Sequence, residues 1–145
     1  MGKRRFDSPR ELFDSIIGEL KKKNVTVYST DGDRFEAKTY SGLDGGEIIL
    51  RGSSSGIDVN VSFFHGGGLA TSILEELIRK KYDTRPFIMH DNLNEFSPEQ
   101  IANNLYTAVC EYERIRKSPL FMNFVQEEKS LADRVTEVFS GQLSK

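Results

Sequence analysis

The chain has 145 residues, a net charge of −2 and a single cysteine, Cys110. A chain of this length forms one domain with its own hydrophobic core, and one cysteine excludes an intrachain disulfide and fits a reducing compartment. The charge excludes an overall field that attracts nucleic acid or an anionic membrane, and no apolar run reaches the roughly 20 residues that span a bilayer. The N-terminus has no signal-peptide pattern, so we expect a cytoplasmic protein with no membrane partner.

The first half of the chain predicts one helix followed by four short strands. Ser8 and Glu11 form a capping box around Pro9 at the start of the helix, and Asn24 suits a left-handed stop after it. Alternating apolar residues and turn residues then predict strands over 25–30, 34–40, 47–51 and 57–64. Their short connections predict an antiparallel meander, either an open sheet or a small barrel.

The stretch that follows predicts a helix near 70–82 and a short edge strand over 87–89. A capping box of Ser72 with Glu75 places the start of the helix as late as Ser72. The apolar stripe of this helix consists of Ile73, Leu74, Leu77 and Ile78. With the short strand, the sheet has four or five strands.

Two long helices are expected to end the chain, one starting at Ser97-Pro98 and one at Ser118-Pro119. Almost no linker separates them, so the pair forms either an antiparallel hairpin or one sharply bent element. The whole chain, 1–145, is therefore predicted to be a single α+β domain with three C-terminal helices. It divides into a helix and a β meander over 8–68 and a mainly helical part over 69–145.

The order of elements over residues 8–51 resembles the first half of Sm-like barrels. The resemblance lies in the N-terminal helix, the strand from Val25, the Asp31-Gly32 turn, and Leu43-Asp44 before the strand from Glu47. Members of that family bind RNA as rings. The family's second-strand glycine and its RNA-contacting asparagine have no counterpart in this chain, so the resemblance assigns no site residues.

A run of one histidine and three glycines joins the fourth strand to the following helix. Glycines let backbone N–H groups approach a phosphate closely, and the N-terminus of a helix favours an anion. The run therefore predicts a site for a phosphate-bearing ligand, either a nucleotide or a nucleic acid; a flexible connection is the other interpretation. The candidate ligand-binding residues are His65, Gly66, Gly67, Gly68, Thr71, Ser72 and Arg51.

Glu36 and Lys38 fit the E-x-K pattern of metal-dependent nucleases. That chemistry needs a second carboxylate to share the divalent cation, and Asp31 and Asp33 are the acids nearby. The other interpretation is the polar face of an alternating strand. The two histidines and Cys110 have no ligand-like spacing, so we expect no bound metal and no cofactor.

The start of the last helix is unusually apolar for a junction between two helices. It holds Leu120, Phe121, Met122 and Phe124, which either tuck into the core or form an interface. No catalytic constellation stands out in the sequence. The leading hypothesis is therefore a non-enzymatic, cytoplasmic protein-interaction or regulatory module that binds a protein partner or another copy of itself.

Overall fold

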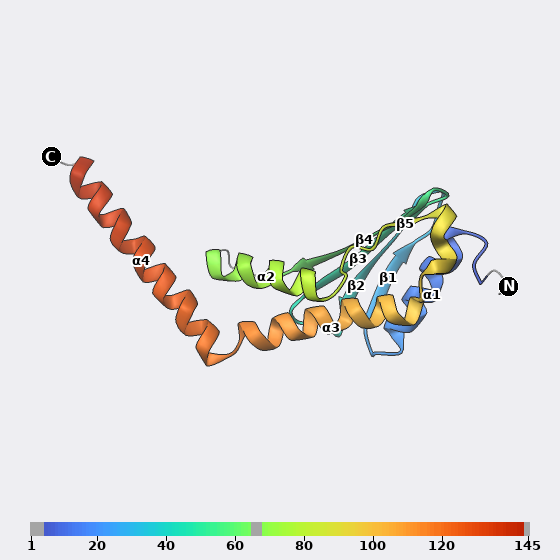
Figure 1. Cartoon of the computed structure of the whole chain (residues 1–145), viewed down its shortest axis with the longest axis horizontal. Coiled ribbons are helices and arrows are strands. Elements are labelled where there is room, and N and C mark those ends of the chain that lie inside the picture. Colours follow the sequence, from blue (N-terminus) through green and yellow to red (C-terminus); the bar gives the residue numbers. More distant parts are fainter. Residues whose placement is uncertain (1–4, 65–67, 144–145) are drawn as a thin grey trace.

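The computed structural model describes residues 5–64 and 68–143 (Figure 1). Along the chain lie α1 (Pro9–Lys21), β1 (Thr26–Thr30), β2 (Phe35–Ser41), β3 (Gly46–Ser53), β4 (Gly56–Phe63), α2 (Leu69–Lys81), β5 (Ile88–Met89), the 3₁₀ helix η1 (His90–Glu95), α3 (Pro98–Arg116) and α4 (Pro119–Leu143). Within these residues the predicted α+β class is confirmed. An N-terminal helix precedes an open antiparallel sheet of five strands, and three α-helices end the chain.

The strands follow one another across the sheet in chain order, and each neighbouring pair is antiparallel. In this register Glu36 on β2 lies opposite Arg51 on β3, which lies opposite Asp58 on β4. In the described part of the chain β1 and β5 are the two edges, so the sheet is open and the small-barrel alternative is wrong. The layout therefore departs from the closed Sm-like barrel.

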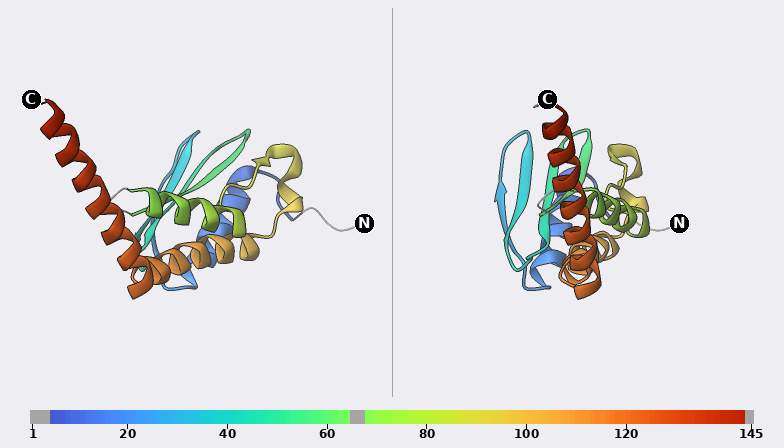
Figure 2. Two further views of the ribbon diagram at one scale, coloured as in Figure 1. Left: turned by 60° about the vertical axis from the view of Figure 1, so that its left-hand side comes forward. Right: turned by 90° about the vertical axis from the view of Figure 1, so that its left-hand side faces the viewer.

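One face of the sheet carries the core, and α1 and α3 cover it (Figure 2). Buried positions alternate with exposed or half-buried ones along β3 and β4, as the sequence pattern predicts. Phe13 of α1 packs edge-on against Phe35, with ring centroids 4.6 Å apart. Tyr112 of α3 packs against Phe63 at 4.5 Å. Aromatic contacts therefore hold each of the two helices to the sheet.

The expected helix caps of α1 and α3 are present. The Ser8 hydroxyl accepts a hydrogen bond from the Glu11 amide, and the Ser97 hydroxyl accepts one from the Gln100 amide. Asn24 adopts a φ of 64°, the left-handed stop that its side chain favours. The capping box at α1 is not reciprocal, because the Glu11 carboxylate accepts from the amide of Asp7 instead of that of Ser8.

The late start of α2 at Ser72 is wrong, because the helix begins at Leu69. Gly68 precedes it with a φ of 100°, a conformation that a residue with a side chain rarely adopts. The Ser72 hydroxyl lies inside the first turn and donates to the Gly68 carbonyl at 3.0 Å instead of capping the helix. The helix therefore starts directly beside the glycine run.

The junction between α3 and α4 is a sharp bend and not an antiparallel hairpin (Figure 1). Ser118 makes the turn: its hydroxyl donates to the Ile115 carbonyl at 2.7 Å and accepts from the Phe121 amide at 3.3 Å. After the bend α4 runs outward from the sheet and the other helices. Every described side chain from Leu131 to Gly141 is exposed.

Candidate functional site

The predicted ligand residues do not all come together. His65, Gly66 and Gly67 lie outside the described residues. Gly68, Thr71 and Ser72 lie at the start of α2, where Thr71 is buried and Ser72 is exposed. Arg51 is not part of this group, because it lies opposite Asp58 near the other end of β4.

A carboxylate from α4 occupies the N-terminus of α2. Glu128 accepts hydrogen bonds from the backbone amides of Leu69 and Ala70, the second at 3.1 Å. Gly68 lies so close that a Cβ built on it meets the Glu128 carboxylate oxygen at 3.5 Å. A helix N-terminus stabilises negative charge, so this side chain takes the position predicted for a ligand phosphate. It also ties α4 to α2.

 Four of the predicted residues line one hollow between α2 and α4: Gly68 and Thr71 from the ligand set, and Phe121 and Met122 from the interface set. The hollow has a volume of about 640 Å³, and a groove beside β5 at the other end of the sheet is larger, at about 910 Å³. The residues that line the hollow are Gly68, Thr71, Arg116, Phe121, Met122, Val125, Gln126, Glu128, Lys129 and Ala132.

The apolar corner between α3 and α4 divides into a packed part and an exposed part. Phe121 is half-buried and packs against the core. Leu120, Met122 and Phe124 are exposed, and the exposed apolar residues continue along α4. The exposed large apolar side chains of α4, each with its exposed fraction, are Leu120 (69%), Met122 (58%), Phe124 (54%), Leu131 (58%), Val135 (60%), Val138 (66%) and Phe139 (63%).

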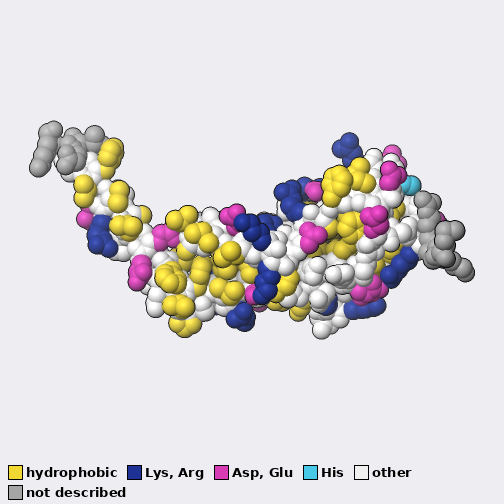
Figure 3. Space-filling model, in the orientation of Figure 1, with side chains coloured by type: hydrophobic (Ala, Val, Ile, Leu, Met, Phe, Trp, Pro, Cys, Tyr) yellow, Lys and Arg dark blue, Asp and Glu magenta, His cyan; other side chains and the backbone are white. Residues whose placement is uncertain are grey.

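The apolar stripe predicted for α2 also divides between two faces. Leu74 and Ile78 are buried in the core, as expected. Ile73 and Leu77 are exposed, together with Leu69, so this part of the prediction is wrong. Figure 3 shows hydrophobic side chains gathering over α2, over the corner between α3 and α4, and along α4.

Glu36 and Lys38 lie in a row of charges on the outer face of the sheet. The Glu36 carboxylate pairs with Arg51 at 2.7 Å and with Lys38 at 3.5 Å. The hydrogen bond from Arg51, with help from Lys38, holds the pKa of Glu36 below its usual value. The carboxylate of Asp31 pairs with Arg10. No cluster of three or more possible metal ligands occurs among residues 5–64 and 68–143, and the nuclease hypothesis stays a prediction.

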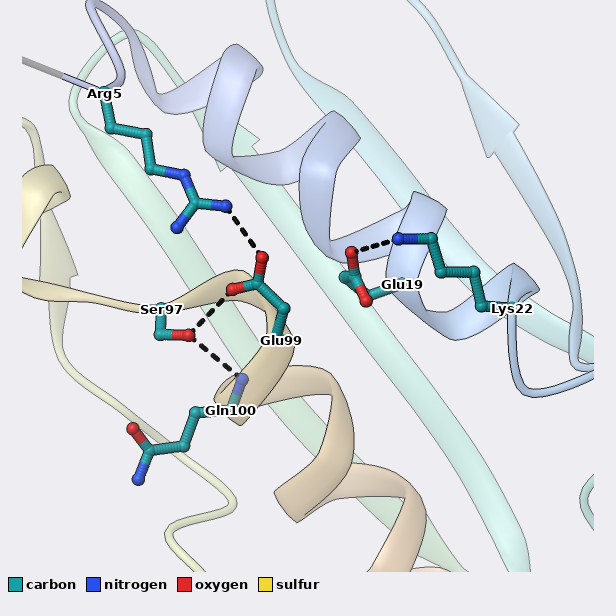
Figure 4. A network of polar contacts seen from close by, with 6 residues as sticks. All are labelled: Arg5, Glu19, Lys22, Ser97, Glu99 and Gln100. Atoms are coloured by element: carbon teal, nitrogen blue, oxygen red, sulfur yellow. Dashed lines mark hydrogen bonds and ion pairs between the residues drawn. The ribbon is translucent and has the colours of Figure 1, made fainter.

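A polar network ties the N-terminal segment to the start of α3 (Figure 4). Arg5 pairs with Glu99 at 2.7 Å, and the Ser97 hydroxyl donates to the same carboxylate at 2.8 Å. These hydrogen bonds lower the pKa of Glu99 to about 2, with that from Arg5 contributing most. The network therefore joins two distant parts of the chain through the half-exposed carboxylate of Glu99.

The sequence pattern predicts neither the contact of Glu128 with α2 nor the exposed face of α2. Glu128 leaves no local signal, because it caps a helix that begins 59 residues earlier. The exposed positions Leu69, Ile73 and Leu77 follow a spacing of four, which is visible in the sequence. That spacing does not show which side of the helix the core covers.

No family model matches the chain, and neither does any curated protein or any solved structure. Of the described helices, none combines the length and the apolar character that a membrane crossing requires.

Proposed function

We propose that this chain is a non-enzymatic protein-interaction module whose binding surface is the apolar face of α4 together with the exposed stripe of α2. The observation that carries the proposal is the set of seven large apolar side chains on α4, each more than half exposed. Exposed apolar side chains that recur along one side of a helix, as Leu131, Val135 and Val138 do, are typical of a protein–protein interface. A cytoplasmic location belongs to the same proposal.

The lack of packing along the outer half of α4 supports the proposal. Helices in proteins are stabilised mainly by the packing of an apolar face, and isolated helices are marginal in water. The part of α4 from Leu131 to Gly141 is exposed throughout, so its apolar face packs on nothing in the described part of the chain. A partner that covers this face supplies the missing packing.

A cysteine-protection experiment in intact cells tests the proposal. Leu131→Cys and Asp133→Cys are made separately in a Cys110→Ser background, so that each protein has one thiol. Both positions are exposed in the chain alone, so a maleimide labels both at similar rates when no partner is present. In cells, we expect the thiol at position 131 to react several times more slowly than the thiol at position 133. Equal rates in cells would contradict the proposal.

A second candidate function is the binding of a phosphate-bearing ligand at the start of α2. It is supported by the amides of Leu69 and Ala70, which already hold a carboxylate. A phosphate must displace Glu128 to reach them, so Glu128→Ala is expected to bind inorganic phosphate more tightly than the wild type does. A thermal-shift titration measures this, with Glu137→Ala, at another exposed glutamate of α4, as the control. If phosphate stabilises none of the three proteins, this candidate is rejected.

A further inference from the structure

We infer that the partner of this surface is a second copy of the chain, and that the two α4 helices pair antiparallel about a two-fold axis between Lys129 and Ser130. The inference rests on the proposed function, because it names the occupant of the same surface. It is carried by the spacing of the apolar residues along α4 and by the placement of two charges beside them.

Five apolar residues of α4 recur at two positions of a seven-residue repeat. Phe121, Glu128 and Val135 occupy one position of the repeat, and Phe124, Leu131 and Val138 occupy the other. All except Glu128 are apolar. A repeat of seven with two apolar positions is the pattern by which two helices wind around each other and bury a common seam.

In the antiparallel pair, residues at equal distances from the axis lie opposite each other. Phe121, which is half-buried against the core of its own copy, then lies opposite Val138 of the second copy, and Phe124 lies opposite Val135 of the second copy. Every aromatic ring of the seam therefore meets a smaller β-branched side chain. The overlap runs from about residue 119 to residue 140, a length of roughly 32 Å at 1.5 Å per residue.

Charge complementarity selects the antiparallel direction. Glu127 and Arg134 occupy the same flanking position of the repeat, one repeat apart, and neither forms an ion pair with any described residue. In an antiparallel pair this flanking position faces its own equivalent on the other helix. Glu127 of each copy therefore meets Arg134 of the other, and the two-fold axis forms this pair twice.

A parallel pair of α4 helices lacks the match between Glu127 and Arg134. In a parallel pair, the flanking position that holds these two residues faces the flanking position on the other side of the seam. Glu127 then lies beside Ala132 of the second copy, and Arg134 lies beside Phe139 of the second copy. It also places Glu128 opposite Glu128 of the second copy, where like charges repel. In the antiparallel pair Glu128 lies opposite Leu131 instead, so no like charges meet at this position of the seam.

Charge reversal with sedimentation equilibrium of the full chain tests the inference. The wild type is expected to form dimers. Glu127→Arg and Arg134→Glu each place like charges together, and each is expected to weaken the dimer by at least about tenfold. The double variant E127R/R134E restores both pairs and is expected to return to wild-type affinity, as is an equimolar mixture of the two single variants. Asp133→Arg, on the side of α4 away from the seam, is the control and leaves the affinity unchanged.

The outcomes separate this inference from the proposed function. A wild type that is monomeric at every concentration overturns the inference, and so does a double variant that stays as weak as the single variants. If the thiol at position 131 is still protected in cells, the proposed function stands and the partner is a different protein. If neither dimer nor protection is found, both fail. Circular dichroism of each variant shows that the helices are retained.

Discussion

The Glu128 carboxylate of α4 accepts a hydrogen bond of 3.1 Å from the Ala70 amide of α2. A helix that otherwise projects away from the fold is thereby fastened to the N-terminus of another helix. The same contact places negative charge at the positive end of the α2 dipole. It therefore fixes where the apolar face of α4 lies and fills the site that the glycine run predicts for a phosphate.

Removal of this cap is expected to destabilise the protein. Glu128→Gln keeps the size of the side chain but removes the charge that the amides of Leu69 and Ala70 stabilise. We expect a loss of about 1 kcal/mol in the free energy of unfolding, the usual cost of a lost N-terminal cap. Urea unfolding measures it, and Glu137→Gln is the matched control because Glu137 is an exposed glutamate of α4 with no role in the cap or the seam. Equal effects of the two variants would show that the cap contributes nothing.

The pKa of Glu99 predicts a dependence of stability on acid pH. Its pKa is about 2 in the folded chain and close to 4.5 when the side chain is free. A lowered pKa means that the carboxylate stabilises the fold above pH 4.5 and that this stabilisation is lost as the pH falls from about 4.5 to about 2.

Glu99→Gln is therefore expected to flatten the loss of melting temperature in this pH window. Melting followed by circular dichroism between pH 2 and pH 5 measures the change. Glu95→Gln serves as the control, since Glu95 is exposed and forms no ion pair with the described residues. If Glu99→Gln keeps the wild-type pH profile, as Glu95→Gln is expected to, then the contact between Arg5 and Glu99 does not stabilise the fold.

Tyr112 predicts a dependence of stability at alkaline pH. Burial raises its pKa to about 12, and its hydroxyl donates to the Phe64 carbonyl at 3.2 Å. A raised pKa means that the unfolded chain loses this proton first, so stability falls as the pH rises from about 10 to about 12. Tyr112→Phe is expected to reduce that fall, whereas Tyr40→Phe, an exposed control, leaves it unchanged. Urea unfolding at pH 9 and pH 11 measures the loss of the free energy of unfolding in the wild type and both variants. If Tyr112→Phe loses as much as the wild type, ionisation of Tyr112 is not the cause of the loss.

Two glycines predict opposite effects of the same substitution. A Cβ at Gly52 would overlap the ring of Phe35, and that ring packs against Phe13. Gly52→Ala is therefore expected to lower the free energy of unfolding by about 1–3 kcal/mol through overpacking. Gly18 lies in α1 with no atom near its Cβ position, so Gly18→Ala is expected to raise it by about 0.5–1 kcal/mol. Urea unfolding measures both changes in the free energy of unfolding. A gain in Gly52→Ala like that in Gly18→Ala would contradict the packing described for Phe35.

Local chemistry explains which parts of the fold the sequence predicts. The caps at Ser8 and Ser97 and the stop at Asn24 depend only on neighbouring residues, and all three are confirmed. The strands follow from alternation, and their short connections determine the antiparallel order. The open sheet was one of two alternatives, because alternation along each strand does not determine whether the last strand returns to the first.

The features that the sequence did not predict depend on distant contacts. The start of α2 at Leu69 is set by Gly68 and by Glu128, whose carboxylate comes from another helix. The exposure of Ile73 and Leu77 depends on where α3 lies, which the spacing along α2 does not encode. The candidate surface was therefore predicted only at its corner, around Leu120 to Phe124, and its extension along α4 required the direction of the helix.

Photo-crosslinking from α4 in cells tests directly whether the apolar face of this helix is an interface. A photoreactive phenylalanine analogue replaces either Leu131 in the seam or Asp133 on the opposite side. We expect an adduct from position 131 with twice the 16.5 kDa mass of the chain, and no adduct from position 133. An adduct of another mass from position 131 would replace the second copy with a different partner. No adduct from position 131, or equal adducts from both positions, would contradict the claim that this face is an interface.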